Sequence, residues 1–330
     1  MVSLQDLHSF GLSAKAGVVK RLSKMESLPS VGMNDEPFLV LGEGTNTVFV
    51  DDYEGVVVKP ELRGIAIKEE KERYLVEVGA GENWHQLVNY LLARNINGLE
   101  NLAYIPGTVG AAPVQNIGAY GAEFSFFCEA VRCYDLELNK MVSLSREECG
   151  FGYRESLFKS SEIKRFIITS VTLSFVKNWC PNLNYAGLDE LPENTSAMDV
   201  FNQVIAIRRS KLPDPKIQGN AGSFFKNPII TKSAYDILRA DNAIPQFPVD
   251  AEHVKVPAAW LIEQCGFKGK TWGGVQCHPA QPLVLVNSGQ ATGKELLEAA
   301  REIRKKVYDT FSVHLTNEVR LIGREGEVAL

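Results

Sequence analysis

The chain has 330 residues and a formal net charge of −5, with 45% hydrophobic and 23% charged residues. This composition is ordinary for a globular protein, and the length predicts two or three domains. Because the sequence has no basic block, no long apolar run and no signal peptide, we expect no nucleic-acid partner, no membrane insertion and a cytoplasmic location. Six cysteines without metal-ligand spacing and five scattered histidines predict free thiols and no metal site.

The first informative element is a glycine loop at residues 39–50, LVLGEGTNTVFV. It predicts a strand, a turn through GEGTN at residues 42–46, and a second strand. A Rossmann fingerprint needs G-x-G-x-x-G at the start of a helix, and this loop lacks both the third glycine and a helical pattern after it. We therefore predict a phosphate-binding loop of another kind.

Strands and a helix follow. Residues 73–81, RYLVEVGAG, and 169–176, TSVTLSFV, alternate apolar and polar side chains and predict half-buried strands. Between them, WHQLVNYLLAR at residues 84–94 places its apolar side chains at helical spacing. This part of the chain therefore predicts a sheet covered by at least one helix.

The second glycine-rich stretch is AYIPGTVGAAPVQNIGAYGAE at residues 103–123, which has no Lys or Arg and one carboxylate. Its glycines let backbone N–H groups approach a ligand closely. An apolar segment rich in such donors suits a buried anion such as a pyrophosphate, and the alternative is a pair of tight turns. Together, the two glycine loops predict a long cofactor whose pyrophosphate lies between them.

Three polar clusters are candidates for chemistry. FGYRESLFK at residues 151–159 places Arg154 among aromatic residues, and the alternative is a surface turn with a solvated arginine. In GNAGSFFKNP at 219–228, Ser223 lies in a turn, like a positioned acid or nucleophile, although there is no G-x-S-x-G elbow and a plain Gly-Ser turn remains open. Glu318 lies in HLTNEVRLIG at 314–323, a predicted strand, as an acid catalyst or as a satisfied edge residue.

The C-terminal part predicts more helices. LPDPK at residues 212–216 predicts a domain junction, because the residue before each proline is pushed away from the helix. Helices are expected near 201–211, 258–264 and 294–308, the last opened by a capping box at residues 292–295. Strands and clustered helices without strict βα alternation predict an α+β fold.

The segments GEGTN, VEVGAGENW, IPGTVGAAPVQNIGAYGAE, YRESLFK, AGSFFKNP, LIEQCGFKG and NEVRLIG, in this order, resemble the UDP-N-acetylenolpyruvoylglucosamine reductase family. The resemblance extends from about Leu39 to Gly323. It implies an FAD-binding domain of the vanillyl-alcohol-oxidase type in two α+β subdomains, residues 1–65 (joined by 319–330) and 66–211, and a C-terminal α+β substrate-binding domain, residues 212–318. The interval from Phe175 through LNYAGL resembles the longer subtype of the family, with an extra Tyr-bearing loop.

The resemblance also implies an activity. It is the reduction of UDP-N-acetylglucosamine enolpyruvate to UDP-N-acetylmuramate by NADPH through non-covalently bound FAD, in a monomeric enzyme of peptidoglycan precursor synthesis. The residues that match the catalytic positions of the family are Arg154, Ser223 and Glu318. Those that match its FAD-binding loops are Gly42, Gly44, Thr45, Asn46, Gly107, Thr108, Gly110, Ala111, Ala112, Gln115, Asn116, Gly118, Ala119 and Tyr120. Those that match its substrate contacts are Tyr153, Tyr185, Lys211, Asn227 and Gln281.

The chain departs from the family pattern at three places. Thr45 stands where the family usually has Ser, which keeps a hydroxyl. Ala111 and Ala112 stand where a hydroxyl residue is common, so some contacts to the pyrophosphate must come from the backbone. Tyr185 is followed by Ala186 before the glycine, which shifts its alignment with the mobile tyrosine of the family.

The chemistry agrees with these matches. Hydride addition to the enolpyruvyl ether leaves an enolate beside a carboxylate, which Arg154 can bind with two parallel hydrogen bonds. Glu318 either donates a hydrogen bond when neutral or orients Arg154 or a water when ionised. Ser223 would then deliver the proton to the α-carbon. Lys211 offers a point charge for the diphosphate.

Two other classes of protein remain as alternatives. An O₂-using flavin oxidase could share the cofactor fold, but many such oxidases attach FAD to a His in the first glycine loop, and GEGTN has none. A flavin-binding regulatory protein or scaffold would need none of Arg154, Ser223 and Glu318. We therefore favour the NADPH-dependent reductase.

Overall fold

The computed structural model describes residues 1–31, 37–159, 165–241 and 243–330. By their contacts the residues of the chain divide into two units: unit 1 consists of 1–17, 44–54 and 211–330, and unit 2 of 18–43 and 55–210. The chain leaves unit 2 for the last time after Ser210 and continues in unit 1 from Lys211. This point lies directly before LPDPK, where prolines occupy two of five positions. The finer division into three domains made from the sequence remains a prediction.

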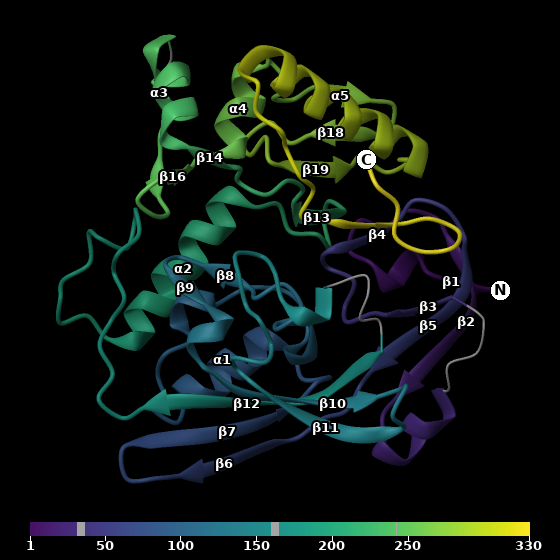
Figure 1. Cartoon of the computed structure of the whole chain (residues 1–330), viewed down its shortest axis with the longest axis vertical. Coiled ribbons are helices and arrows are strands. Elements are labelled where there is room, and N and C mark those ends of the chain that lie inside the picture. Colours follow the sequence, from purple (N-terminus) through teal and green to yellow (C-terminus); the bar gives the residue numbers. More distant parts are fainter. Residues whose placement is uncertain (32–36, 160–164, 242) are drawn as a thin grey trace. The chain divides into compact units, whose positions relative to one another are not determined.

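Unit 2 contains a five-stranded sheet in which every neighbouring pair of strands is antiparallel (Figure 1). Its order is β11 (Lys140–Ser145), β10 (Cys128–Asp135), β12 (Phe166–Val176), β7 (Arg73–Gly79) and β6 (Ile65–Glu69). The two strands predicted from alternating side chains are β7 and β12, and both are confirmed. They pair directly, with Val78 opposite Val171 and Val76 opposite Leu173, and all four side chains are buried.

Two helices complete the main core of unit 2. In α1 (Trp84–Leu92), which confirms the prediction, the Asn83 side chain accepts a hydrogen bond from the N–H of Gln86 and so satisfies a free donor at the helix start. α2 (Ala197–Lys211) begins earlier than the predicted residue 201, because Ser196 and Asp199 each accept a backbone N–H of the other. The apolar faces of both helices share one hydrophobic cluster with β7, β10 and β12.

The remaining elements of unit 2 are short and hold its loops in place. β3 (Phe38–Val40) pairs in parallel with the unit 2 part of β5 (Tyr53–Pro60), and β8 (Gly118–Ala119) pairs with β9 (Ala122–Glu123) inside the second glycine stretch. Among the described residues of unit 2 there are also short 3₁₀ helices at Met25–Val31, Glu100–Leu102, Val109–Ala111, Phe124–Phe126 and Leu157–Lys159.

Unit 1 is built on a second sheet, of order β13 (Asn220–Ser223), β19 (Val284–Asn287), β18 (Val275–Cys277) and β17 (Thr271–Trp272). The helices α4 (Ala258–Gln264) and α5 (Gly293–Phe311) pack against it in one hydrophobic cluster (Figure 1). The predicted capping box is confirmed: the Thr292 side chain accepts from the N–H of Glu295, whose carboxylate accepts from the N–H of Thr292. This box satisfies two free donors at the helix start, and the buried side chains of α5 lie in the core of unit 1.

The rest of unit 1 includes a helix that the sequence analysis missed. α3 (Lys232–Asp241) packs beside a small sheet of order β14 (Ile229–Thr231), β16 (His253–Lys255) and β15 (Phe247–Pro248). Tyr235 is buried and Leu238 partly buried in one hydrophobic cluster with Val254 of β16, while Ile237 points to solvent. Near the start of the chain, β1 (Val2–Ser3) pairs with the unit 1 part of β2 (Lys15–Leu22), with a 3₁₀ helix at Gln5–Leu7 between them.

One prediction about a strand needs correction. β20 (Arg320–Ile322), in parallel with β4 (Thr47–Phe49), is shorter than the predicted strand at 314–323. Glu318 therefore precedes the strand and lies in a bend. Its N–H donates to the carbonyl of Phe224 and so does not take part in the pairing of β20 with β4. The antiparallel sheets with clustered helices agree with the α+β prediction.

Candidate active site

The two glycine stretches of the sequence meet at Gly42 in unit 2. A Cβ added to Gly42 would lie 2.9 Å from the Thr108 hydroxyl oxygen and 3.2 Å from the Ala111 side chain. Only glycine therefore allows this close approach without a shift of its neighbours. The Glu43 carboxylate strengthens the contact by accepting hydrogen bonds from the Asn83 amide and from the N–H of Gly107, each at 3.1 Å.

Most amides between Gly107 and Ala112 are already used inside the protein. Val109 donates to Glu82 at 2.8 Å, Gly110 to Ala80 at 2.9 Å and Ala112 to Val109 at 3.1 Å. Gly110 is required for another reason, because its Cβ would lie 2.6 Å from the Cβ of Ala80. The glycines of this stretch thus permit close packing as well as access to a ligand.

Asn116 plays a supporting part in the same stretch. Its side chain is buried, and its Nδ2 donates to the Glu123 carboxylate and to the carbonyl of Gly152, at 2.9 and 3.1 Å. Its Oδ1 accepts the N–H of Ser125 at 2.9 Å. Because the protein uses this amide group so fully, the side chain of Asn116 stabilises the loop, and the predicted contact of this residue with FAD remains a prediction.

A buried cation lies at the first glycine loop. Lys59, at the end of β5, is 9% exposed and donates from its ammonium to the carbonyl oxygen of Gly42. Burial is the main cause that lowers the pKa of Lys59, and Arg21 adds to this effect. A cation held so close to glycine backbone suits a phosphate group. The sequence analysis missed it, although a Lys directly after the apolar run VVV was a visible signal.

Arg154 is presented by a two-residue turn in unit 2. Gly152 and Glu155 exchange both backbone hydrogen bonds, at 3.0 and 3.2 Å, with Tyr153 and Arg154 between them. Arg154 has φ +55°, a left-handed conformation that costs a non-glycine residue about 1 kcal/mol or more. Its Nη2 donates to the carbonyl of Gly118 at 2.8 Å. The structure therefore gives Arg154 a strained, anchored position rather than that of a solvated surface arginine.

A second arginine lies within electrostatic range of the first. Arg208, on α2, donates from Nε to the carbonyl of Tyr104 at 3.2 Å and bonds to the hydroxyl of Tyr120. Burial lowers the pKa of Arg208, and the charge of Arg154 lowers it further. Two guanidinium groups within this range repel each other, so an anion bound near them would be stabilised. The sequence offered a signal for it: Arg208 continues the buried stripe of Val200 and Val204 on α2.

Two tyrosines, Tyr120 and Tyr185, pack together in this region. Tyr120 has φ +51° and is 8% exposed, and burial raises the pKa of its hydroxyl. The Tyr185 ring packs edge-on against the Tyr120 ring, with centroids 5.0 Å apart. Asn101 fixes both segments, since its Nδ2 donates to the carbonyls of Tyr120 and Asn182 at 2.8 and 2.9 Å. Tyr185, predicted to contact substrate, thus lies beside the predicted FAD loop.

In unit 1, three predicted segments are joined by hydrogen bonds. The Asn46 amide of GEGTN donates to the carbonyl of Glu318 at 3.1 Å, and the N–H of Glu318 donates to the carbonyl of Phe224 at 2.8 Å. Phe224 directly follows Ser223. The structure therefore brings together the first glycine loop, Ser223 and Glu318, which lie far apart in the sequence.

Ser223 ends strand β13 at a bulge. Asn220 pairs with Val286 and Ser223 with Val284, so β13 carries one residue more than its partner strand. Gly222 accommodates the extra residue with φ +73°, and a Cβ there would meet nothing within 4 Å. The half-buried Ser223 is thus re-aimed by its neighbour and carries no strain itself. The predicted turn with Ser223 at its apex is therefore wrong: Ser223 ends a strand, β13, and a bulge in that strand takes the place of the turn.

The predicted substrate contacts of unit 1 have separate places. Lys211 is the exposed last residue of α2. Asn227 accepts the N–H of Ala258 at 2.9 Å through its Oδ1 and so caps α4. Gln281 is half-buried in the turn between β18 and β19, where its N–H donates to Nδ1 of His278 at 3.1 Å. Their contacts with substrate remain predictions.

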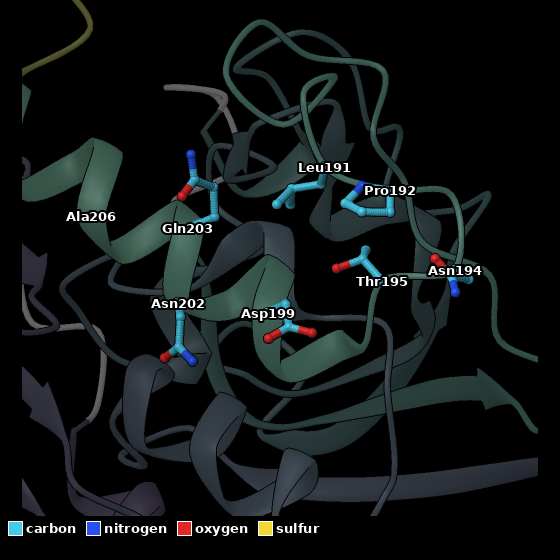
Figure 2. Close-up of a pocket in the computed structure, with 8 residues that line it drawn as sticks. All are labelled: Leu191, Pro192, Asn194, Thr195, Asp199, Asn202, Gln203 and Ala206. Atoms are coloured by element: carbon cyan, nitrogen blue, oxygen red, sulfur yellow. The ribbon is translucent and has the colours of Figure 1, made fainter.

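A surface depression of about 620 Å³ lies elsewhere in unit 2. Figure 2 shows Asp199, Asn202 and Gln203 of α2 across from Leu191 and Thr195. None of its lining residues is a predicted site residue, so this depression is separate from the candidate site. Across the described parts of the chain, no group of three or more His, Cys, Asp or Glu side chains could hold a metal ion, and none of the described helices is long and apolar enough to cross a membrane.

Two family models match the chain. One, described as an FAD binding domain, matches residues 30–143, and the other, described as the C-terminal domain of UDP-N-acetylenolpyruvoylglucosamine reductase, matches residues 214–322. The crystal structure of the reductase from Thermus caldophilus has a TM-score of 0.67, with 24% identity over 97% of each chain. Together with the α+β architecture, these matches define an FAD-binding oxidoreductase with a distinct C-terminal domain, and they confirm the expected fold class.

Curated relatives make the family specific. UDP-N-acetylenolpyruvoylglucosamine reductase from Pseudoalteromonas atlantica is 46% identical over 99% of this chain and 96% of its own length. The protein of the same name from Pectobacterium atrosepticum is 47% identical over 99% of this chain and 97% of its own length. The chain belongs to the UDP-N-acetylenolpyruvoylglucosamine reductase family.

Proposed function

We infer that this protein reduces UDP-N-acetylglucosamine enolpyruvate to UDP-N-acetylmuramate, with FAD as cofactor and NADPH as reductant, in bacterial peptidoglycan precursor synthesis. The observation that carries this conclusion is the match over 99% of the chain to reductases of that name. The FAD-binding model over residues 30–143 supports the cofactor independently. The reaction is therefore an NADPH-dependent reduction of a UDP-linked enol ether.

The residues at the glycine loops fit a dinucleotide cofactor. The close approach at Gly42 and the buried ammonium of Lys59 are features that a bound pyrophosphate would use. When bound, FAD supplies the transfer of hydride from NADPH to the substrate double bond. We propose that Gly42, Thr108 and Lys59 hold its pyrophosphate region, in addition to the other contacts predicted from the sequence.

Arg154 is proposed to bind the substrate carboxylate. Negative charge grows on that carboxylate as the enolate forms, and a guanidinium stabilises it with two parallel hydrogen bonds. Arg208 beside it supports this role, because two adjacent cations favour an anion more than one does. Arg208 is proposed as a second cation of the same anion site.

Ser223 is proposed to give its proton to the α-carbon of the enolate. A serine hydroxyl is a weak acid, and an enolate is a base strong enough to accept its proton. Glu318 is held close by through Phe224, and it either donates a hydrogen bond as a neutral acid or orients a neighbouring group as a carboxylate. Lys211, Asn227, Gln281, Tyr153 and Tyr185 are proposed to bind the UDP-sugar.

An anaerobic titration tests the function. NADPH added to the yellow protein should bleach the flavin band, and UDP-N-acetylglucosamine enolpyruvate should then restore it in the absence of oxygen. A flavin that stays bleached after substrate is added, yet recovers in air, would favour an oxidase instead.

The finer properties are proposed on the same basis. The flavin is proposed to be non-covalent, because GEGTN has no His to attach it; after acid precipitation the yellow colour should remain in the supernatant. A monomeric state, a cytoplasmic location, the lack of a nucleic-acid partner and membership of the subtype with the Tyr loop are proposals of the same kind. Size-exclusion chromatography with light scattering tests the first of these.

A further inference from the structure

One serine near the start of the chain connects two of the loops in unit 1. Ser9 donates its N–H to the carbonyl oxygen of Gly44, in the first glycine loop, at 3.1 Å. Its hydroxyl donates to the carbonyl oxygen of Asn220 at 2.6 Å, and its own carbonyl accepts the N–H of Asn220 at 3.1 Å. Ser9 thus bonds to GEGTN on one side and to the start of β13 on the other.

Asn220 passes this connection on to Ser223. Its side chain is buried, and its Oδ1 accepts the N–H of Gly222 at 3.0 Å. Gly222 is the residue with φ +73° whose bulge aims Ser223. Nδ2 of Asn220 donates to the carbonyl of Gln218 at 2.8 Å, so the side-chain amide of Asn220 cannot rotate freely. The position of Ser223 therefore depends on where Ser9 holds Asn220.

Close packing makes the connection rigid. A Cβ on Gly44 would lie 2.1 Å from the carbonyl oxygen of Leu7, and one on Gly219 would lie 2.5 Å from that of Phe10. Asn287 also donates to the Phe10 carbonyl at 3.0 Å. Residues 7–10 thus fit between two glycines, and small movements of this segment reach both loops.

We propose that Ser9 is a positioning residue, which fixes Ser223 relative to the first glycine loop for proton transfer to the substrate. This inference rests on the proposed function, in which Ser223 supplies the proton. Removing the Ser9 hydroxyl deletes the 2.6 Å bond to the Asn220 carbonyl and a longer contact of 3.5 Å with the Gly44 carbonyl, and it leaves the backbone bonds in place. The expected consequence is a misplaced Ser223 in a folded, flavin-loaded protein.

The test compares Ser9→Ala, Ser9→Thr and the matched control Ser13→Ala, an exposed serine four residues along. Stopped-flow traces of the flavin band measure reduction by NADPH and reoxidation by UDP-N-acetylglucosamine enolpyruvate separately. Melting temperature and flavin content are measured on the same preparations. Ser9→Ala should slow reoxidation about ten- to hundredfold, as a misplacement near 1 Å does, and leave reduction by NADPH within about twofold.

Each outcome decides a point. Ser9→Thr, which keeps the hydroxyl, should recover most of the reoxidation rate, and Ser13→Ala should match the wild type. Equal slowing of both steps, or a loss that follows the flavin content, would make Ser9 purely structural and overturn the proposal. Wild-type rates in Ser9→Ala would also overturn it. If substrate fails to reoxidise even the wild-type flavin, the proposed function itself is wrong.

Discussion

The turn that presents Arg154 in unit 2 and the bulge that presents Ser223 in unit 1 solve the same problem differently. Arg154 itself adopts the left-handed φ of +55°, and its own side chain anchors it to Gly118. At Ser223 the preceding glycine adopts φ +73°, and the serine stays unstrained. Backbone strain therefore lies on Arg154 itself in unit 2, whereas in unit 1 the positive φ lies on Gly222, the neighbour of Ser223. Mutations can therefore test the two arrangements independently.

The largest effect is expected at Ser223. Ser223→Ala should leave flavin reduction by NADPH nearly unchanged and slow reoxidation by substrate about a hundred- to ten-thousandfold, the loss typical of a missing general acid. Stopped-flow spectroscopy of each step measures this. If both steps slow equally, Ser223 is a structural or flavin-contact residue, and Glu318 becomes the leading acid.

Arg154 should follow. Arg154→Ala should lower kcat about a hundred- to a thousandfold, since it removes a preorganised group that stabilises developing charge. Arg154→Lys should restore little, because a point charge cannot form two parallel hydrogen bonds. Steady-state kinetics of the three proteins are the measurement, and near-wild-type turnover of the Lys variant would show that Arg154 supplies only charge.

The loss of kcat in Glu318→Gln should be smaller than in Glu318→Ala if Glu318 acts as a neutral hydrogen-bond donor.

The unit 1 region should also be sensitive to acid through His8. Burial lowers the pKa of His8 from 6.5 to about 4, and its Nε2 lies 3.1 Å from the Leu12 carbonyl. His8 binds a proton more readily in the unfolded chain than in the folded protein. Its contribution to the free energy of unfolding is therefore fully present above pH 6.5 and is lost as the pH falls towards 4. The loss should reach about 2 kcal/mol between pH 7.5 and about pH 5.

Urea unfolding at both pH values measures this term. His8→Asn should remove it, while His314→Asn, a change at an exposed histidine, should retain it. An equal pH dependence in His8→Asn and the wild type would show that His8 titrates normally in the folded protein.

The glycine of the bulge offers a smaller and more selective test. Gly222→Ala should cost about 1–2 kcal/mol through backbone strain alone, since the added Cβ meets open space. Gly266→Ala is the matched control, with φ +77° and equally open surroundings. Chemical denaturation should find similar losses in both, and only Gly222→Ala should slow reoxidation by substrate. Slower reoxidation in both variants would show that the bulge at Gly222 does not control the orientation of Ser223.

The smallest effect is the strain at Arg154 itself. Arg154→Gly should be more stable than Arg154→Ala by about 1 kcal/mol, because glycine adopts a positive φ without penalty. Both variants lack the guanidinium, so the difference isolates the backbone. Equal unfolding free energies would mean that the turn relaxes when Arg154 is replaced.

Local patterns in the sequence predicted the parts of the protein that local forces determine. The periodicity of α1 and β12 and the capping box at Thr292 were predicted correctly, because each depends on neighbouring residues. Family resemblance led to the proposed roles of Arg154 and Glu318, because the periodicity of a sequence carries no information about such roles.

The features that the sequence did not predict depend on contacts between distant segments. Ser9 and Asn220 are 211 positions apart, and nothing near Ser9 indicates that they bond. Lys59 and Arg208 end or continue apolar patterns, so their burial becomes visible only when the loops around them are in place. α3, which the sequence did not predict, packs beside β14 and β16 and contributes Tyr235 and Leu238 to their hydrophobic cluster.

The central claim, that the protein is a reductase and passes its electrons to a UDP-linked substrate, is tested most directly by stoichiometry in air. NADPH oxidation, hydrogen peroxide and UDP-N-acetylmuramate are measured together while the enzyme turns over UDP-N-acetylglucosamine enolpyruvate. A reductase should form equal amounts of oxidised NADPH and UDP-N-acetylmuramate, with hydrogen peroxide at background. NADPH consumption matched by hydrogen peroxide, with the substrate unchanged, would contradict it.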